Sequence, residues 1–489
     1  MAKRTAIVDI GSNSVRMVIF EKTSRFAFHL LHEAKSRVRI SEGAYENGGN
    51  LQETAMERGL NALRDFLSIA DAYRVRKILC VATSAVRDAP NKNDFLKRAK
   101  ADLSLNIKVI DGEKEAYLGA IACANLLPRT DAVTIDIGGG STECAYIQNG
   151  DVTRTYSLDL GTVRLKELFF DRGDIEGATA YIDTALAELP TCDCAHAIGI
   201  GGTFRALANT LLKRGGHPLR KLHGYRFDAE TIQHYIDAVI AAKDDNALKK
   251  LGVKKERFDV IRPGALILSR MLRFLQTKKL TSSGVGVREG VFLSDLLRNA
   301  KHRFPEHFNP SMRYLLDRYD SEPELTRNIA TVAKRLFDLT HEKLAVPMRY
   351  RTELSIAAKL CKIGTTLHYY SHHQHSYYLA QTALEYGYTH DQIMLISTLV
   401  RFQKRKQPAK SHYEDFETLL PDAHTLNYLS FMLSLADALL SHHPKNIDFD
   451  LNFDGRTITV EPKPQASLYL AREAVKTLQR PQTLRVAFL

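Results

Sequence analysis

Apolar runs and helically spaced apolar residues alternate through the first 300 positions of the chain. Short apolar runs at 5–10, 15–21 and 77–82 are typical of buried strands, and residues 51–70 carry leucines at the spacing of one helix face. Strands that alternate with helices predict an α/β fold with a mixed sheet. The same pattern predicts further strands at 29–40, 107–110, 132–137, 144–147, 151–157 and 195–200, a strand and turn at 282–291, and helices at 93–100, 163–170, 178–189 and 291–298.

One of these apolar runs, 132–137, ends in an acid and enters a glycine turn. Asp136 is followed by Gly138-Gly139-Gly140, then by Ser141 and Glu143. Residues without a Cβ make so tight a turn easily, and the turn exposes successive backbone N–H groups that can hold phosphate oxygens. The two carboxylates are oxygen ligands of the kind that Mg²⁺ shares with phosphates. The stretch therefore predicts a site for a magnesium-bound phosphate.

The same pattern occurs 127 positions earlier (136 − 9). Residues 8–14 read Val-Asp-Ile-Gly-Ser-Asn-Ser and align with 135–141, so that Asp, Ile, Gly and Ser recur in register. Each copy consists of a strand, a turn and a second apolar strand. An internal repeat of this kind predicts two similar subdomains that face one another. The alternative is a pair of unrelated glycine hairpins.

A third glycine turn follows the apolar run 195–200, in the sequence Gly199-Ile200-Gly201-Gly202-Thr203. Its glycines open a predicted helix, and a helix N-terminus is a natural anion site. The signal is weak alone, because many nucleotide-binding folds carry it. As the third such turn in one α/β unit it supports a phosphate site.

Two acids, Glu113 and Glu115, stand in the first turn of a helix predicted to begin after Asp111-Gly112. Their ordinary role would be to complement the helix dipole. The other interpretation is that one of them orients a water molecule in the cleft, because this segment connects the first predicted subdomain to the second.

Composition adds an expected ligand class. The net charge of +12 favours an anionic partner, which is nucleic acid, an acidic membrane surface or a polyanionic substrate. The N-terminal residues run directly into the first strand, which indicates no signal peptide, and no apolar stretch is long enough to span a bilayer. Cys192-Asp193-Cys194 lacks the spacing of a redox or zinc motif, so the six cysteines are expected to be reduced, buried thiols in the cytoplasm.

A change of pattern marks a boundary near residue 300. Of the 18 histidines, 12 lie after that point, the proline-containing segment 300–312 is typical of a linker, and 323–440 is almost wholly helical in periodicity. Residues 446–460 alternate around an Asp-Gly turn, which predicts a hairpin, with a helix at 466–478 and a strand at 483–488 after it. The predicted domains are 1–124, 125–300, 301–440 and 441–489.

Taken together, these motifs resemble those of the exopolyphosphatase/guanosine pentaphosphate phosphohydrolase (Ppx/GppA) family, within the actin-like ATPase-fold superfamily. The resemblance covers about residues 5–298. It implies two actin-like (ribonuclease H-like) α/β subdomains with a facing cleft, an α-helical HD-like domain, a small α/β C-terminal cap, and a homodimer. The stretches that carry it are Asp9–Ser14 with Arg16, Thr83–Arg87, Gly112–Ala116, Asp136–Glu143 and Val287–Gly290.

The family enzymes release the terminal phosphate of inorganic polyphosphate, and many convert guanosine pentaphosphate to tetraphosphate. The resemblance implies that Glu115 activates the attacking water; Lys114 departs from the family pattern, which leaves Glu113 as a lesser candidate. It further implies Mg²⁺ on Asp136 and Glu143 with Asp9 nearby. Arg87 is either a cation at the cleft mouth or an ordinary surface or salt-bridged arginine. The residues expected to bind phosphate are Gly11, Ser12, Asn13, Ser14, Arg87, Gly138, Gly139, Gly140, Ser141, Gly202 and Thr203.

The helical region resembles the HD-type domain of long family members. In metal-dependent HD phosphohydrolases a His-Asp pair would stand where this chain has Cys361-Lys362, while Asp437 looks like the late aspartate of that pattern. Lys362 places a positive charge where a metal would sit, so no second metal site is expected.

Two further features of the helical region each have two interpretations. The cluster His372/His373/His375 either packs within the domain or lies on its plain surface, or it contacts a polyanion. The basic run 401–410 is either a solvated face or a track for a long anion, whose binding would weaken with salt.

The leading hypothesis is a Mg²⁺-dependent phosphoanhydride hydrolase acting on inorganic polyphosphate, guanosine pentaphosphate or both. An ATP-dependent kinase or ATPase of the same fold is the second reading, and a non-catalytic binder of nucleic acid or alarmones is the third. No ordered basic–aromatic motif supports nucleic-acid recognition, and no membrane partner is expected. The sequence leaves the choice between the two substrates open.

Overall fold

In the computed structural model, residues 3–128, 131–190, 195–404 and 406–489 are described, and the chain divides into two compact units, 1–308 and 309–489. The division falls eight residues after the boundary expected at 300 (308 − 300). The finer subdivision at 124 and 440 stays a prediction. Cys192, Cys194 and Arg405 lie outside the described residues.

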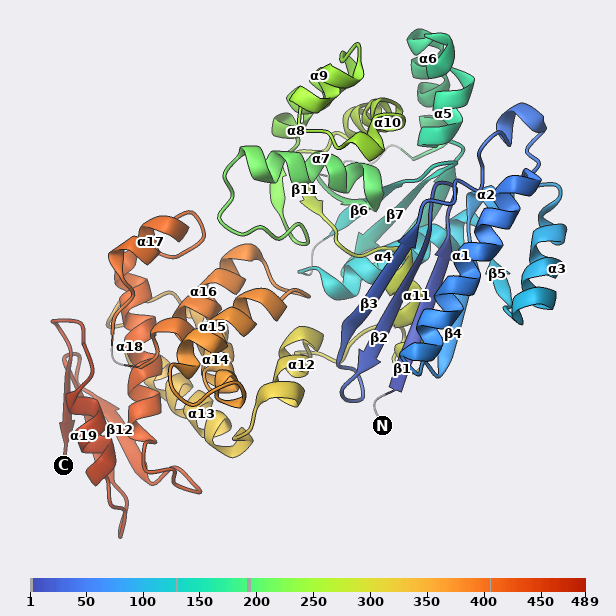
Figure 1. The fold of residues 1–489 in the computed structure, drawn as a ribbon. Coiled ribbons are helices and arrows are strands. Elements are labelled where there is room, and N and C mark those ends of the chain that lie inside the picture. Colours follow the sequence, from blue (N-terminus) through green and yellow to red (C-terminus); the bar gives the residue numbers. More distant parts are fainter. Residues whose placement is uncertain (1–2, 129–130, 191–194, 405) are drawn as a thin grey trace. The chain divides into compact units, whose positions relative to one another are not determined.

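The first unit begins with a five-stranded sheet in the order β3-β2-β1-β4-β5. Strand β1 pairs antiparallel with β2 and parallel with β4. Apolar side chains of β1 pack against α1 and α3, and α1 runs along one face of the sheet in Figure 1. We call this sheet with its helices the first lobe. Its elements are β1 (Lys3–Ile10), β2 (Val15–Lys22), β3 (Phe28–Ser36), α1 (Glu53–Ala72), β4 (Lys77–Ala82), α2 (Ser84–Arg87), α3 (Lys92–Leu103) and β5 (Ile107–Val109).

A six-stranded sheet in the order β10-β11-β9-β6-β7-β8 forms the second lobe. Its run β8-β7-β6-β9-β11 repeats the connectivity and strand directions of β3-β2-β1-β4-β5, with β10 added antiparallel at the edge. The sequence repeat is therefore matched by a repeated sheet topology. The strands are β6 (Ala132–Ile137), β7 (Thr142–Gln148), β8 (Asp151–Leu158), β9 (His196–Ile200), β10 (Arg226–Asp228) and β11 (Lys279–Ser282).

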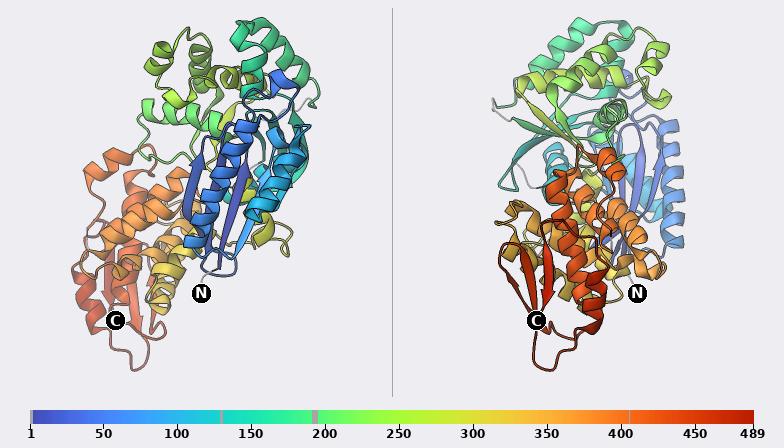
Figure 2. Two further views of the ribbon diagram at one scale, coloured as in Figure 1. Left: turned by 45° about the vertical axis from the view of Figure 1, so that its right-hand side comes forward. Right: turned by 90° about the vertical axis from the view of Figure 1, so that its left-hand side faces the viewer.

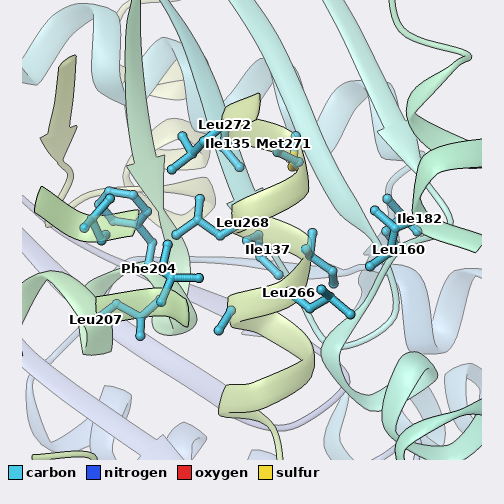
Figure 3. Packing of buried hydrophobic residues seen from close by; sticks show 14 of the residues in the cluster. Ile135, Ile137, Leu160, Ile182, Phe204, Leu207, Leu266, Leu268, Met271 and Leu272 are labelled. Carbon is cyan, nitrogen blue, oxygen red and sulfur yellow. The ribbon is translucent and has the colours of Figure 1, made fainter. Parts of the chain in front are cut away.

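Helices α7 (Gly201–Arg214) and α10 (Ile261–Phe274) close the core of the second lobe. Figure 3 shows Phe204 and Leu207 of α7 beside Ile135 and Ile137 of β6, with Leu268 of α10 in the same cluster. This packing fixes the ends of β6 and β9, from which the second and third glycine turns leave. The remaining helices of the lobe are α5 (Thr162–Leu168), α6 (Ile175–Leu186), α8 (Ala229–Ile240) and α9 (Asp245–Lys250).

Two helices pack on the sheet of the other sequence half. Helix α4 (Gly112–Leu126) follows the first sheet in the chain, yet its Ala116, Ala120 and Cys123 pack on strands of the second. Helix α11 (Val287–Leu296) comes last, yet Phe292 stacks on Phe20 of the first sheet with ring centroids 4.4 Å apart. The two helices also contact one another.

The expectation of a strand and turn over 282–291 is wrong for most of that segment. Strand β11 ends at Ser282 and α11 begins at Val287. Glu289 caps the helix, since its Oε2 accepts a hydrogen bond from the Gly286 N–H at 2.7 Å. The alternating glycines and valines at 284–287 belong to the loop that leads into α11 and to the first residue of that helix, and they do not form a strand.

The second unit is a set of helices followed by a small three-stranded sheet in the order β12-β13-β14, visible in the right-hand view of Figure 2. The hairpin predicted at 446–460 is present as β12 and β13, paired antiparallel. The helices are α12 (Pro310–Tyr319), α13 (Pro323–Thr340), α14 (Arg351–Leu360), α15 (His372–Ala383), α16 (His390–Phe402), α17 (Lys410–Phe416), α18 (Ala423–Leu439) and α19 (Tyr469–Lys476), and the strands are β12 (Phe449–Phe453), β13 (Thr457–Pro462) and β14 (Arg485–Phe488).

The four cysteines within the described residues, Cys80, Cys123, Cys144 and Cys361, are free and buried. Burial raises the pKa of each thiol, so these cysteines stay protonated and unreactive. None of the described helices combines the length and the apolar character that a membrane crossing requires.

Candidate active site

The two glycine hairpins are closed by the same hydrogen bond. The Gly11 N–H donates to the Ser14 carbonyl at 3.2 Å, and the Gly138 N–H donates to the Ser141 carbonyl at 2.9 Å. These two N–H groups are therefore engaged in the turns, contrary to the expectation that each whole turn is open to phosphate. In the described chain, the next two N–H groups of each turn donate no hydrogen bond, and these belong to Ser12, Asn13, Gly139 and Gly140.

The two turns approach each other across the lobes. A Cβ added to Gly139 would lie 2.7 Å from Cβ of Ser12, so no larger residue fits where the turns meet. The second turn is fixed from behind, because the Thr162 and Val163 N–H groups of α5 donate to the carbonyls of Gly138 and Gly139 at 3.0 and 2.8 Å. The free N–H groups of both turns thus belong to one confined region.

A cavity of about 160 Å³ lies at this junction. Most of the predicted site residues line it: Asp9, Gly11, Ser12, Asn13, Ser14, Glu115, Asp136, Gly138, Gly139, Ser141, Gly202 and Thr203. Three predicted residues, Arg87, Gly140 and Glu143, are not among its walls. The cavity takes residues from both lobes and from the N-terminus of α4.

Asp136 occupies the end of β6, under the third glycine turn. Gly201 has a φ of 78°, which L side chains rarely adopt, and an added Cβ would collide with Asp136 Oδ1. Burial raises the pKa of Asp136 to about 6; Arg205 opposes this increase and the charge of Asp9 adds to it. The close fit of glycine against the carboxylate explains why this turn carries no side chain.

Asp9 is the equivalent of Asp136 in the first lobe, at the same place in its strand. Burial raises its pKa, while the guanidinium groups of Arg288 and Arg16 lower it. Arg16 is also its cross-strand neighbour in the hairpin. Both acids are thus held in a dry environment beside arginines.

Helix α4 brings Glu115 into the cavity and leaves Glu113 exposed outside it. Asp111 caps the helix by accepting the Lys114 N–H at 2.7 Å. Burial, and then the charges of Glu143, Asp9 and Asp136, raise the pKa of Glu115 well above its ordinary value. A carboxylate with a raised pKa is a stronger base toward a bound water.

Arg87 and Glu143 lie behind the cavity wall and contact its residues. Arg87 Nη1 donates to Glu115 Oε2 at 3.4 Å, which makes it a partner of the carboxylate that lines the cavity. Glu143 is buried on β7 opposite Asp136, and its Oε1 accepts from Ser157 Oγ at 3.0 Å. Burial raises the pKa of Glu143 to about 8, with a further increase from Asp136.

Sequence reasoning assigned no role to most of the cations of the site. Beside the three acids Asp9, Glu115 and Asp136, five cations line the cavity: Arg16, Lys35, Arg205, Arg257 and Arg288. The excess of positive charge favours an anionic ligand. Arg205 had a usable signal, since it follows Gly201 by one helical turn and donates back to its carbonyl at 2.9 Å. Lys35 and Arg257 come from distant segments that no motif marks.

The donor set fits a magnesium ion shared with substrate. No group of three or more His, Cys, Asp or Glu side chains within the described residues is arranged to hold a metal alone. Asp9 and Asp136 nevertheless line one polar cavity, and Mg²⁺ is commonly bound by one or two carboxylates with water and phosphate oxygens as the other ligands. Of the predicted metal ligands, Asp9 and Asp136 line the cavity and Glu143 lies behind it, and the ligand set stays a prediction.

Some of the polar residues singled out in the second unit have partners within that unit. Lys362 Nζ contacts both carboxylate oxygens of Asp437, at 2.7 and 2.9 Å. His372 is buried, and burial followed by the charge of Lys362 lowers its pKa to about 4. In the basic run 401–410, Arg401 Nη1 donates to His412 Nδ1 at 2.9 Å, so this arginine packs within the unit. The proposed contact of the cluster His372/His373/His375 with a polyanion stays a prediction.

Comparison with protein families decides the identification. Residues 18–299 match the Ppx/GppA phosphatase family, and residues 309–453 match domain III of Ppx/GppA phosphatases. The chain belongs to the Ppx/GppA phosphatase family. A curated relative from Aeromonas hydrophila, a guanosine-5'-triphosphate,3'-diphosphate pyrophosphatase, is 27% identical over 412 residues, which are 82% of this chain and 80% of that protein.

Solved Ppx/GppA structures share the fold of the first unit. A family member from Aquifex aeolicus aligns with a TM-score of 0.53 and 28% identity, covering 61% of this chain and 99% of the other. An exopolyphosphatase from Cytophaga hutchinsonii aligns with a TM-score of 0.55 and 25% identity, over 60% of this chain and 98% of the other. The expected mixed α/β fold with two sheets is confirmed by its match to the actin-like Ppx/GppA structures, and a helical region follows it. The HD-like assignment of that region stays a prediction.

Proposed function

We propose that this Ppx/GppA phosphatase is a Mg²⁺-dependent hydrolase that removes the terminal phosphate from inorganic polyphosphate, guanosine pentaphosphate or both. The observation that carries the proposal is the convergence of Asp9, Glu115 and Asp136 with two partly open glycine turns on one cavity of excess positive charge. The names of the relatives agree, since one acts on a guanosine polyphosphate and another is an exopolyphosphatase.

The two turns bind the end of the substrate. The unengaged N–H groups of Ser12, Asn13 and Gly139, which line the cavity, supply donors to the phosphate oxygens without any reorganisation at the moment of reaction. Arg16, Arg205 and Arg288 supply positive charge at the same place. Phosphoryl transfer depends chiefly on this kind of positioning and charge neutralisation.

Glu115 receives the proton of the attacking water. Its carboxylate faces the cavity, and the surrounding acids keep its proton affinity high. Arg87 fixes the carboxylate from behind through its Nη1. The water oxygen forms a bond to the terminal phosphorus, the bridging P–O bond breaks, and the shortened chain leaves with its bridging oxygen.

A magnesium ion would be held by Asp9 and Asp136 together with phosphate oxygens and water, and it would neutralise charge on the substrate. A bound cation would offset the burial and mutual repulsion of these acids, which agrees with their raised pKa values. Glu143, hydrogen-bonded to Ser157, lies opposite Asp136 on the neighbouring strand.

The test is orthophosphate release by the purified full-length chain with Mg²⁺, from polyphosphate and from guanosine pentaphosphate in parallel. We expect release from at least one substrate without any phosphate acceptor, and loss of release on chelation. Release from neither substrate, or ADP formation from ATP only when an acceptor is added, would contradict the proposal; the second result would favour a kinase of the same fold.

A further inference from the structure

A second cavity opens beside the first. It has a volume of about 540 Å³ and lies in the second lobe, bounded by α7, by α8 through Tyr235, and by the loop 252–257. Four residues line both cavities: Arg16, Gly202, Arg205 and Arg257. The two cavities are therefore adjacent, and these four residues lie where they meet.

The walls of this second cavity carry far more positive than negative charge. Six cations line it against the single acid Glu256. The six are Arg16, Arg205, Lys213, Arg214, Lys254 and Arg257. The rest of the lining is mainly apolar or neutral, including Leu207, Val253 and Ile261.

The positive charge of these cations is only partly offset by nearby carboxylates. None of the six forms an ion pair with a carboxylate in the part of the chain that the structure describes. Arg16 and Arg257 are partly buried, and burial followed by neighbouring arginines lowers the pKa of both. Like charges gathered in excess raise the energy of the protein alone, and a bound anion lowers it.

The cavity is placed to receive a part of the substrate that does not react. The acids proposed for catalysis, Asp9, Glu115 and Asp136, line only the first cavity. Lys213 and Lys254 line only the second, and both are exposed at its rim. An anionic group bound there is separate from the phosphate that is cut.

We propose that the second cavity binds a second group of phosphates on the same substrate molecule, with Lys213 and Lys254 as specificity-determining residues. This inference rests on the proposed function. The shared chemistry is a phosphate cluster remote from the reacting end. It has two sources, the 3'-diphosphate of guanosine pentaphosphate and the inner units of a long polyphosphate chain.

The kinetic test uses the full-length double variant Lys213→Gln/Lys254→Gln and three substrates: guanosine pentaphosphate, long-chain polyphosphate and tripolyphosphate. Loss of two exposed phosphate contacts should raise KM about tenfold for whichever substrate reaches the cavity. The kcat values and the KM for tripolyphosphate, which is too short for both sites, should stay unchanged. The matched control, Lys97→Gln/Lys100→Gln, removes the same charge from α3, which lines neither cavity.

The pattern of KM changes identifies the source. A change for guanosine pentaphosphate alone assigns the cavity to the 3'-diphosphate, a change for polyphosphate alone assigns it to the chain, and a change for both supports the shared chemistry. Unchanged KM for both, with normal turnover, would overturn the inference while leaving the proposed function intact. An equal increase for tripolyphosphate would also overturn it, because the lysines would then act on the reacting end.

A binding measurement separates the inference from catalysis. The dissociation constants of guanosine tetraphosphate and GDP are measured by calorimetry in the presence of a chelator, for the wild type and both double variants. We expect the cavity variant to lose about tenfold in affinity for guanosine tetraphosphate and none for GDP, which lacks the second diphosphate. If neither substrate is hydrolysed but this difference is found, the second phosphate site stands and the proposed reaction fails. The site is refuted by two results together. The cavity variant loses the same affinity for guanosine tetraphosphate as for GDP, and it binds long-chain polyphosphate as tightly as the wild type does.

Discussion

The two units treat their buried charges in opposite ways. In the first unit, Asp9, Glu115 and Asp136 surround a cavity with arginines that they do not fully pair, and burial raises the pKa of each acid. In the second unit, Lys362 and Asp437 contact each other through both carboxylate oxygens. The first arrangement leaves charge available to a ligand, whereas the second satisfies it within the fold.

The difference shows how a charged cluster that can bind a ligand is distinguished from one that stabilises the fold. Both clusters contain a strand or helix end rich in acids and bases, and both were marked by sequence motifs. The first combines raised acid pKa values, unengaged backbone N–H groups and a cavity. The following predictions test this comparison.

The largest effect is expected at Glu115. The substitution Glu115→Gln removes the base and should lower kcat by about 10²- to 10⁴-fold, with substrate binding retained. The matched variant Glu113→Gln, two residues away on the exposed side, should keep its activity. Steady-state phosphate release and equilibrium binding measure the two quantities. Equal kcat in the Glu115→Gln variant and the wild type would remove this residue from the mechanism.

In the second unit we expect an effect on stability and none on chemistry. Lys362→Met leaves Asp437 without its partner in a mostly buried position and should lower the free energy of unfolding by about 3 kcal/mol. The double variant Lys362→Met/Asp437→Leu should recover most of this loss, because no charge is then left unpaired. Denaturant unfolding measures both. If the double variant is as unstable as the single one, the pair is not merely structural.

Within the first unit, the two glycine turns provide a smaller comparison between equivalent positions. A Cβ at Gly138 would lie 2.9 Å from the Ser141 carbonyl oxygen, whereas a Cβ at Gly11 would have its nearest neighbour, Ser14 O, at 3.5 Å. Gly138→Ala should therefore lower the free energy of unfolding by about 1–2 kcal/mol, and Gly11→Ala should lower it by only a few tenths of that amount. Thermal unfolding of the two variants checks the order. The reverse order would mean that the two turns are not equivalent in their packing.

The smallest effect concerns a buried histidine of the second unit. His412 Nδ1 accepts from Arg401 Nη1, so its Nε2 carries the proton and donates to Thr398 Oγ1 at 2.9 Å. Burial, then Arg401, lowers its pKa from 6.5 to about 4. Since the unfolded chain binds this proton more readily, stability should fall as the pH drops from 6.5 to 4.

The melting temperature at pH 7 and pH 5 measures this dependence. In the His412→Gln variant the decrease between the two pH values should be smaller than in the wild type, although His372, whose pKa is also lowered to about 4, contributes in the same direction. An unchanged decrease would show that His412 takes up no proton on unfolding in this range.

The parts of the fold and site that the sequence predicted are those with a short-range cause. The hairpins at Asp9 and Asp136 depend on a strand, a glycine turn and a second strand, all within a dozen residues, and the repeat predicted that they would face each other. The position of Glu115 follows equally from local pattern, because Asp111 caps the helix that carries it.

What the sequence did not predict depends on distant packing. Arg257 and Lys35 join the site from segments without a motif, and only the folded lobes bring them to the cavity. The start of α11 was mistaken for a strand because Val285 and Val287 alternate with glycine, while the deciding contacts, Phe292 against Phe20 and Phe28, lie more than 260 positions away in sequence (292 − 28 = 264). Glu289 at the third helical position was the one local signal of a helix that was overlooked.

The exchange of α4 and α11 between the sheets has a consequence for how the chain can be cut. A fragment ending before α11 would leave Phe20 and Phe28 of the first sheet without their aromatic cover, and one beginning after α4 would uncover Ala132 and Ala145 of the second. Neither half is therefore expected to fold alone. During synthesis, the apolar face of the first sheet stays partly exposed until residues near 290 have been made. Two such fragments, encoded as separate chains, should be soluble when they are co-expressed and insoluble when each is expressed alone.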